Sequence, residues 1–256
     1  QFLKTGYETV ARLDNIKRIA IRHQNEELAN QQYTVGRYVM FLNTFQRYLA
    51  LLVKNDYENS WMKLQDCLCL AEDVLRFLKD EEQCDIPDIL NLLLKYEQLY
   101  PYKVFASTEM GILESVCSIC GESMLGFECP HIKGNLYWGE VAHEVIKKVE
   151  FQAVALVRNP LDKKCVITVS DDKRTEKERF QLLDYVVNNI PNLLYNFDVD
   201  EKVTRIKRKD VKVVGRNNMC TCGSGKKFKR CCESGLYETH TYYTITIKEK
   251  MRFAEI

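Results

Sequence analysis

The sequence predicts an α+β protein with a helical amino-terminal region, a small mixed middle domain and a carboxyl-terminal metal module. Three observations predict this class. Apolar residues recur at helical spacing through the first hundred residues, the period changes to alternation after Pro101, and cysteines gather in two short clusters. An apolar fraction of 46% in 256 residues is enough for a folded core.

Residues 1–100 form the predicted helical region. Apolar stripes and helix boundaries predict helices over residues 5–30, 32–54, 57–80 and 86–99. Pro87 suits the first turn of the last helix, and its stripe is typical of a core face. We interpret these stripes as the core of a helical bundle. The first two helices could instead pair with another subunit, so a homo-oligomer remains open.

Residues 101–200 form the predicted α+β domain. Extended structure is expected over 102–106, 145–149, 151–157 and 165–169, and a helix over 175–190 that Pro191 ends. The acid pairs Asp171 with Asp172 and Asp198 with Asp200 lie in polar stretches that we interpret as solvated turns.

The last segment, residues 236–256, alternates apolar and polar residues and is rich in β-branched and aromatic side chains. This pattern predicts a terminal strand. Pairing within the middle sheet is the simpler expectation, and docking on the edge of another chain is the alternative.

The most specific chemical signal lies in residues 201–235. Four cysteines stand there as two close pairs separated by eight residues: Cys220, Cys222, Cys231 and Cys232. Four thiolates can close a tetrahedron around zinc at Zn–S distances of about 2.3 Å and leave no open position. Gly223 and Gly225 allow amide groups to approach the sulfurs, and nearby lysines offset the anionic centre. The cluster predicts a structural zinc site.

Residues 214–232 resemble the SEC-C motif, the zinc module at the carboxyl end of the SecA translocase that recurs in many bacterial proteins. This resemblance implies a small recognition module, which in the translocase engages a chaperone. The chain departs from the family at Asn217-Asn218-Met219, where an Asn-Asp/Glu-Pro turn is usual. It also lacks the phosphate-binding loop of a translocase motor.

A second cluster combines three cysteines with one histidine: Cys117, Cys120, Cys129 and His131. Its spacing predicts a Cys3His zinc site, in which the glycine after Cys120 lets the chain turn beneath the metal. Two alternatives stay open. Cys117 and Cys120 could form a redox dithiol, or a free His131 could act as the base of a metal-dependent nuclease, with Asn135 or His143 as a metal ligand.

The segment from Cys117 to Pro160 is also faintly similar to a cysteine and histidine segment of phage capsid-maturation proteins. No serine and histidine pair of a protease accompanies it, so no proteolytic activity is expected. The metalloprotease and deaminase signatures are absent as well, which favours a protein without catalytic activity.

Charge is uneven along the chain although the net charge is only +1. Residues 202–230 contain eleven Lys or Arg and one acid, Asp210. Such a stretch can hold an acidic protein or a nucleic acid. The expected partner-binding residues surround the second cysteine pair: Arg216, Lys226, Lys227, Phe228, Lys229 and Arg230.

The remaining cysteines, Cys67, Cys69, Cys84 and Cys165, are scattered among apolar residues, which fits a reducing cytoplasm better than a disulfide framework. Neither a membrane span nor a signal peptide is expected. The sequence therefore predicts a cytoplasmic adaptor with two zinc ions that recognises a protein partner through its basic SEC-C-like module. The alternative is a nucleic-acid-binding protein, such as a metal-dependent nuclease or a component of a phage-related or defence complex.

Overall fold

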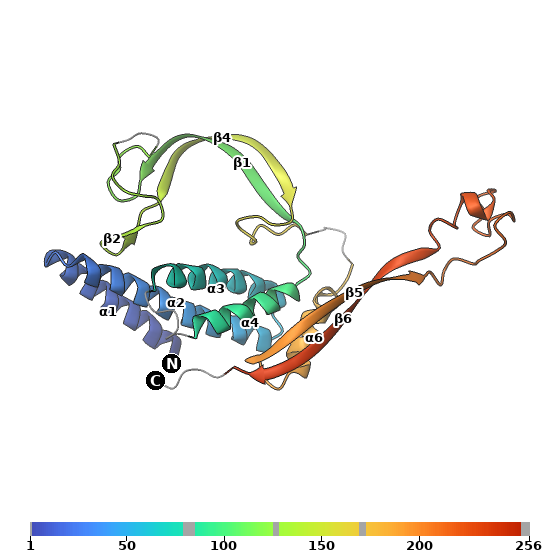
Figure 1. The fold of residues 1–256 in the computed structure, drawn as a ribbon, viewed down its shortest axis with the longest axis horizontal. Helices are drawn as coiled ribbons and strands as arrows, with labels where there is room; N and C mark the ends of the chain where they lie inside the picture. Colours follow the sequence, from blue (N-terminus) through green and yellow to red (C-terminus); the bar gives the residue numbers. More distant parts are fainter. Residues whose placement is uncertain (1, 79–84, 125–127, 169–172, 252–256) are drawn as a thin grey trace. The chain divides into compact units, whose positions relative to one another are not determined.

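The computed structural model describes residues 2–78, 85–124, 128–168 and 173–251. It confirms the α+β class, with helices and short antiparallel sheets in one chain (Figure 1). The chain divides into two compact units. Unit 1 comprises residues 1–194 and 251–256, and unit 2 comprises residues 195–250.

Four helices form the body of unit 1: α1 (Phe2–Arg22), α2 (Glu26–Val53), α3 (Tyr57–Phe77) and α4 (Ile86–Gln98). Helix α2 packs against both α1 and α3, and α4 packs against α3. Pro87 occupies the first turn of α4, as predicted. The predicted helical region therefore folds as packed helices.

The first helix ends eight residues earlier than predicted. Gln24 adopts a positive φ of 53°, which ends α1, and the side chain of Asn25 accepts a 3.0 Å hydrogen bond from the Leu28 N–H at the start of α2. Asn25 is thus an N-cap, followed by Glu26 and Glu27 in the positively polarised first turn. The cap places the break between the first two helices at residues 23–25, whereas the predicted break lay at residue 31.

Aromatic side chains dominate the core beneath α3 and α4. Trp61 is 2% exposed and packs on the rings of Tyr100, Tyr102 and Phe105. Its indole N–H donates a 2.9 Å hydrogen bond to the Lys163 carbonyl. This side chain therefore connects α3 to the segment that leads out of the middle sheet.

Replacing this side chain should cost a large part of the stability of unit 1. We expect Trp61→Ala to lower the free energy of unfolding by about 3–5 kcal/mol, because a large ring leaves a cavity and an unpaired carbonyl. Met62→Ala is the matched control because Met62 is 40% exposed, and its effect should stay within about 0.5 kcal/mol. Guanidinium denaturation followed by circular dichroism measures both; equal effects would contradict the assignment of this core.

Strands β1 (Phe105–Cys117) and β4 (Glu144–Val157) pair antiparallel into a curved two-stranded ribbon (Figure 1). The structure corrects the predicted strands here. β1 continues to Cys117 instead of ending at residue 106, and β4 is one strand where two were expected. The predicted strand at 165–169 is reduced to a bridge between Val166 and Phe105, and its last residue lies outside the described ranges.

The predicted helix over 175–190 is divided into α5 (Glu176–Arg179) and α6 (Gln181–Asn189). Thr175 and Glu178 form a capping box at its start, and the helix ends before Pro191, as predicted. Asp171 and Asp172 lie outside the described residues, as does Cys84. Among the described helices, none is long and apolar enough to cross a membrane.

Unit 2 is a long hairpin of β5 (Tyr195–Lys207) and β6 (Tyr237–Lys250). The structure contains the predicted terminal strand, β6. The predicted pairing of this strand with the middle sheet was wrong, because β6 pairs with β5. Asp198 and Asp200 lie within β5, opposite Thr246 and Thr244, so they are not turn residues. Between the two strands the chain forms the cysteine-rich module, with a short 3-10 helix, η2 (Phe228–Arg230).

Candidate metal centres

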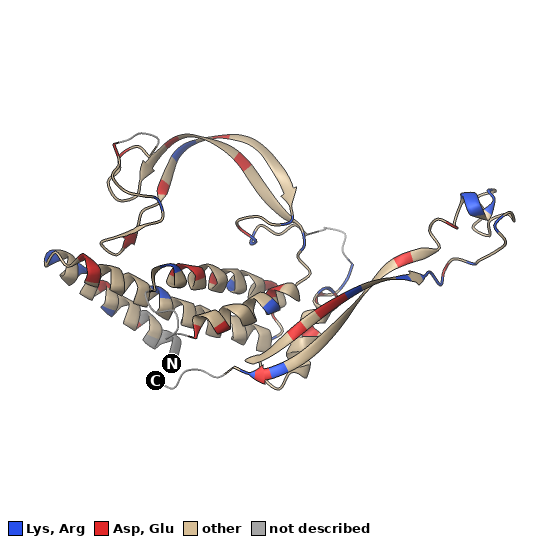
Figure 2. Ribbon diagram, viewed as in Figure 1, with Lys and Arg blue, Asp and Glu red and all other residues tan. Residues whose placement is uncertain are grey.

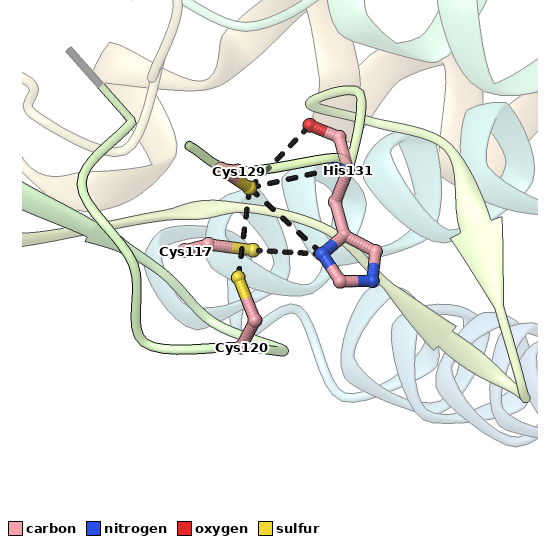
Figure 3. Close-up of side chains that lie close together, drawn as sticks. All are labelled: Cys117, Cys120, Cys129 and His131. Atoms are coloured by element: carbon pink, nitrogen blue, oxygen red, sulfur yellow. Dashed lines mark hydrogen bonds between the residues drawn. The ribbon is translucent and has the colours of Figure 1, made fainter. Parts of the chain in front are cut away.

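The first centre, which we call site 1, lies at the end of the β1–β4 ribbon in unit 1. Cys117 is the last residue of β1, Cys120 lies in the turn that follows, and Cys129 and His131 lie on the returning loop. Figure 3 shows the three sulfurs and the imidazole pointing toward one another. Their donor atoms all lie within 4.8 Å of one another.

The distances in site 1 fit a tetrahedral ion. Cys120 Sγ lies 3.6 Å from Cys129 Sγ, and His131 Nδ1 lies 3.7 Å from Cys117 Sγ and 3.8 Å from Cys129 Sγ. Two sulfurs bound tetrahedrally at about 2.3 Å from zinc are about 3.8 Å apart, and a sulfur and a nitrogen are about 3.6 Å apart. The residues present therefore fit zinc with one imidazole and three thiolate ligands.

Backbone amides point at the sulfurs of site 1. The N–H of Ile119 donates to Cys117 Sγ, and the N–H of His131 donates to Cys129 Sγ, each at 3.4 Å. The backbone of Cys120 also donates to Cys117 and, with Ile119, lowers the pKa of that thiol. Gly121 adopts a φ of +76°, which lets the chain turn back at this point. Such a knuckle prepares Cys117 to bind as a thiolate.

Site 1 is fixed to the helices by a small hairpin of β2 (Leu136–Tyr137) and β3 (Glu140–Val141). The N–H of Gly139 donates to Asn30 Oδ1 at 2.6 Å, and the N–H of Trp138 donates to Glu26 Oε1 at 3.2 Å. Gly139 has a φ of +75°, and an added Cβ would lie 2.8 Å from the Ala29 carbonyl oxygen. Only glycine fits this close approach.

This docking was missed at the sequence level. Asn30 and Glu26 looked like ordinary polar residues of a helix surface, and the sequence offers no local signal that links them to a turn more than a hundred residues away. Gly139 was the one visible sign, because a glycine in a tight hairpin often marks a close backbone approach.

The two alternatives for site 1 find little support in its geometry. His131 directs Nδ1 at two sulfurs, whereas a catalytic base needs that imidazole free of them. His143 is exposed, and its Nδ1 lies 3.2 Å from the Val141 carbonyl oxygen. After Cys117 the chain makes a turn rather than the helix that a thioredoxin-like dithiol requires.

The second centre, site 2, lies in the module of unit 2. The donor atoms of Cys220, Cys222, Cys231 and Cys232 all lie within 4.8 Å of one another. Cys231 Sγ is 3.4 Å from Cys222 Sγ and 3.8 Å from Cys232 Sγ. These spacings again fit a zinc tetrahedron, here with four thiolates.

Short backbone hydrogen bonds hold the module together. The Cys220 N–H donates to the Lys226 carbonyl at 2.8 Å, and the Phe228 N–H donates to the Asn218 carbonyl at 2.9 Å. Phe228 is 2% exposed, so it is the small core of the module. This corrects its expected place on the partner surface: a ring that must fill the module cannot also face solvent.

Protons compete for the four sulfurs of site 2. The hydroxyl and the backbone of Ser224 hydrogen-bond to Cys222 and, with neighbouring thiols, lower its pKa to about 6. Hydrogen bonding with the sulfurs of Cys220, Cys222 and Cys231 raises the pKa of Cys232 to about 12. A divalent cation would replace the remaining protons, because all four sulfurs can bind the same ion as thiolates. Ser224 was not among the predicted site residues, although its hydroxyl lies 3.0 Å from Cys231 Sγ.

The predicted basic residues surround site 2 on the outside. Arg216, Lys226, Lys227, Lys229 and Arg230 are all exposed, and Figure 2 shows Lys and Arg gathered in the module. Arg216 forms a 2.9 Å ion pair with Glu233, so part of its charge is used within the module. The other four side chains form a basic surface around the buried Phe228.

These observations define a class of protein. The chain is an α+β protein with two cysteine-rich groups of metal-ligating type, and residues 216–234 match the SEC-C motif family. The match lies entirely within the module of unit 2. The SEC-C resemblance deduced from the cysteine and glycine spacing is therefore confirmed.

The relatives that share this segment are bacterial SecA proteins. Protein translocase subunit SecA of Clostridium kluyveri is 39% identical over 70 residues, which cover 27% of this chain and 7% of that protein. SecA of Lawsonia intracellularis is 56% identical over 32 residues, or 12% of this chain and 4% of that protein. SecA of Clostridium novyi is 67% identical over 27 residues, or 10% of this chain and 3% of that protein.

The chain thus matches less than a tenth of the length of each of these relatives, and the likeness is that of a shared module. No solved structure matches this chain.

Proposed function

We propose that this protein is a non-catalytic adaptor that holds zinc at two structural sites and recognises a protein partner through the basic surface of its SEC-C module. The observation that carries the proposal is the SEC-C match, together with a donor set that closes around one point at the end of the β5–β6 hairpin. Zinc would be held by Cys117, Cys120, Cys129 and His131 at site 1 and by the four module cysteines at site 2.

Zinc at these sites supplies structure and no open coordination position, because each donor set already contains four ligands. At site 2 the ion holds a short segment with one buried aromatic residue in a single shape. The exposed lysines and arginine then stand on a rigid surface rather than on a loose tail. The ten described cysteines are free of disulfides, which supports a reducing cytoplasm as the location that we propose for a protein with this bacterial-type module.

Charge reversal on the module tests the proposed partner surface. We expect Lys227→Glu with Lys229→Glu to reduce partner recovery at least about tenfold, because like charges then face an acidic partner surface. The measurement is a quantitative pull-down from the native host with bound metal retained. Arg205→Glu with Lys207→Glu, on β5, is the matched control. A partner set unchanged by the module variant would contradict the proposal.

The nucleic-acid alternative rests on the eleven basic residues between 202 and 230. It predicts that both charge-reversal pairs weaken binding and that affinity for RNA or DNA falls steeply and log-linearly with salt. A recognition event confined to the module loses affinity with the Lys227 and Lys229 pair alone. Filter binding at low salt with the same two variants therefore separates the two functions.

A further inference from the structure

The β1–β4 ribbon carries an exposed apolar face that the metal sites do not use. Cross-strand pairs place alternate residues of both strands on this face: Ala106, Thr108, Met110, Ile112, Val149, Phe151, Val154 and Leu156. Phe151 is 62% exposed and Leu156 is 72% exposed. An isolated two-stranded ribbon is only marginally stable in water. A sheet of three strands that share an apolar face is stable, so a third strand added at an edge would stabilise this ribbon.

The outer edge of β1 is closed at both ends and open between them. At one end the Ala106 N–H donates to the Cys165 carbonyl at 2.8 Å, and at the other the Met124 N–H donates to the Ser115 carbonyl. Because outward and inward groups alternate along a strand, Thr108, Met110 and Ile112 also direct their N–H and C=O groups outward. Apart from the bonds of the β1–β4 ladder itself, which the alternation places on the other side of the strand, no backbone hydrogen bond among the described residues reaches these six groups.

The shape of the ribbon favours the β1 edge over the β4 edge. Register shifts leave Lys147 and Gln152 of β4 without direct partners, and Lys148 lies beside the first of these bulges. Bulges and lysines are devices that protect an edge strand from pairing. In β1 the residue without a partner is Leu113, so residues 107–112 are paired one after another, with one register shift between Glu109 and Met110 that is taken up by Gln152 of β4.

Charge selects the occupant of this edge. On the face opposite the apolar one, the same window contains Glu109 and Glu150 and no basic residue. An added strand would therefore place apolar side chains beside Met110 and Ile112, and alternate basic side chains near the two carboxylates.

Area argues against a second copy of this chain covering the apolar face. Seven residues of strand by two strands is roughly 23 Å by 10 Å, or about 230 Å². A stable dimer buries about 800 Å² on each partner. The small face and six open backbone groups suit one extended peptide.

We propose that the β1 edge at Ser107–Ile112 binds an extended polypeptide segment by strand addition, with apolar residues alternating with Lys or Arg. Backbone hydrogen bonds to Thr108, Met110 and Ile112 would supply affinity, and the apolar and acidic faces would select the alternating pattern. This site is separate from both metal centres and from the basic module surface.

The test uses the full chain with its metals and a fluorescent octapeptide of alternating lysine and valine. Fluorescence anisotropy should show saturable binding of this peptide, and the same peptide with glutamate in place of lysine should bind at least about fivefold more weakly. Glu109→Lys should reduce or reverse this preference. Equal binding of the two peptides, or no saturable binding, overturns the proposal.

Proline variants locate the edge. Met110→Pro removes an outward N–H without breaking the β1–β4 ladder and should weaken peptide binding at least about tenfold. Val154→Pro removes an outward N–H on β4 and should leave binding unchanged. Amide exchange in β4 shows that the ribbon persists in the Met110 variant. The assignment is contradicted if the Met110 variant still binds the peptide or if the Val154 variant loses binding. It is also contradicted if, without peptide, the protein has the mass of a dimer and the β1 amides are already protected.

Discussion

We expect Cys222→Ser to reduce bound zinc from two equivalents to one and to unfold the module around site 2. The free energy of structural zinc binding is on the order of 10–16 kcal/mol in small zinc modules, and it is the main stabilising contribution available to a segment with one buried ring. Cys222 is also the thiol whose pKa is lowered to about 6, so it binds metal at little proton cost. Zinc analysis and amide exchange over residues 216–234 measure the outcome.

The two-unit architecture makes this prediction specific. Cys222 belongs to unit 2, so the helices of unit 1 should keep their circular dichroism and melting temperature. Cys69→Ser is the matched control, because Cys69 is exposed on α3 and belongs to neither cluster. A Cys222 variant that retains both zinc equivalents would contradict the site 2 assignment.

Cys117→Ser should have the second large effect, and in unit 1 rather than unit 2. Cys117 ends β1 and is 2% exposed, so its loss removes one zinc and the anchor of the loop that leads to β2. The contacts of Gly139 with Asn30 and of Trp138 with Glu26 then lose their rigid support. We expect the free energy of unfolding of unit 1 to fall by several kcal/mol.

Cys165→Ser is the control for this variant, because Cys165 is exposed and lies outside both clusters. Chemical denaturation followed at a helical signal measures unit 1, and zinc analysis counts the remaining ion. Unchanged zinc content together with unchanged stability would mean that site 1 is not a metal centre.

The helices and the grouping of the donors were predictable from local sequence. Stripes of apolar residues gave α2, α3 and α4, and cysteine spacing brought together both donor sets because their ligands lie on short connected loops. The predicted end of α1 lay eight residues too late, because apolar periodicity was followed past Asn25, which is the N-cap of α2. Cys67 and Cys69 stand two residues apart on α3 and therefore point to different faces, so Cys67 is buried and Cys69 is exposed.

The strands were harder because their pairing depends on distant residues. In β1 the alternation of apolar and polar residues is short, because Leu113 directly follows Ile112, and both faces of the ribbon are largely exposed. β5 contains Asp198 and Asp200, whose polar surroundings resembled a turn, yet Asp198 forms a 2.8 Å ion pair with Lys248 across the hairpin. The local sequence of β6 does not determine whether it pairs with β5 or with the middle sheet.

Zinc stoichiometry and coordination test the central claim most directly. The full chain, purified anaerobically, should contain two equivalents of zinc. X-ray absorption should show Zn–S distances of about 2.3 Å and an average of about 3.5 sulfur and 0.5 nitrogen ligands per ion. Fewer than two equivalents, or a shell with oxygen ligands that indicates an open position, would contradict two closed structural centres.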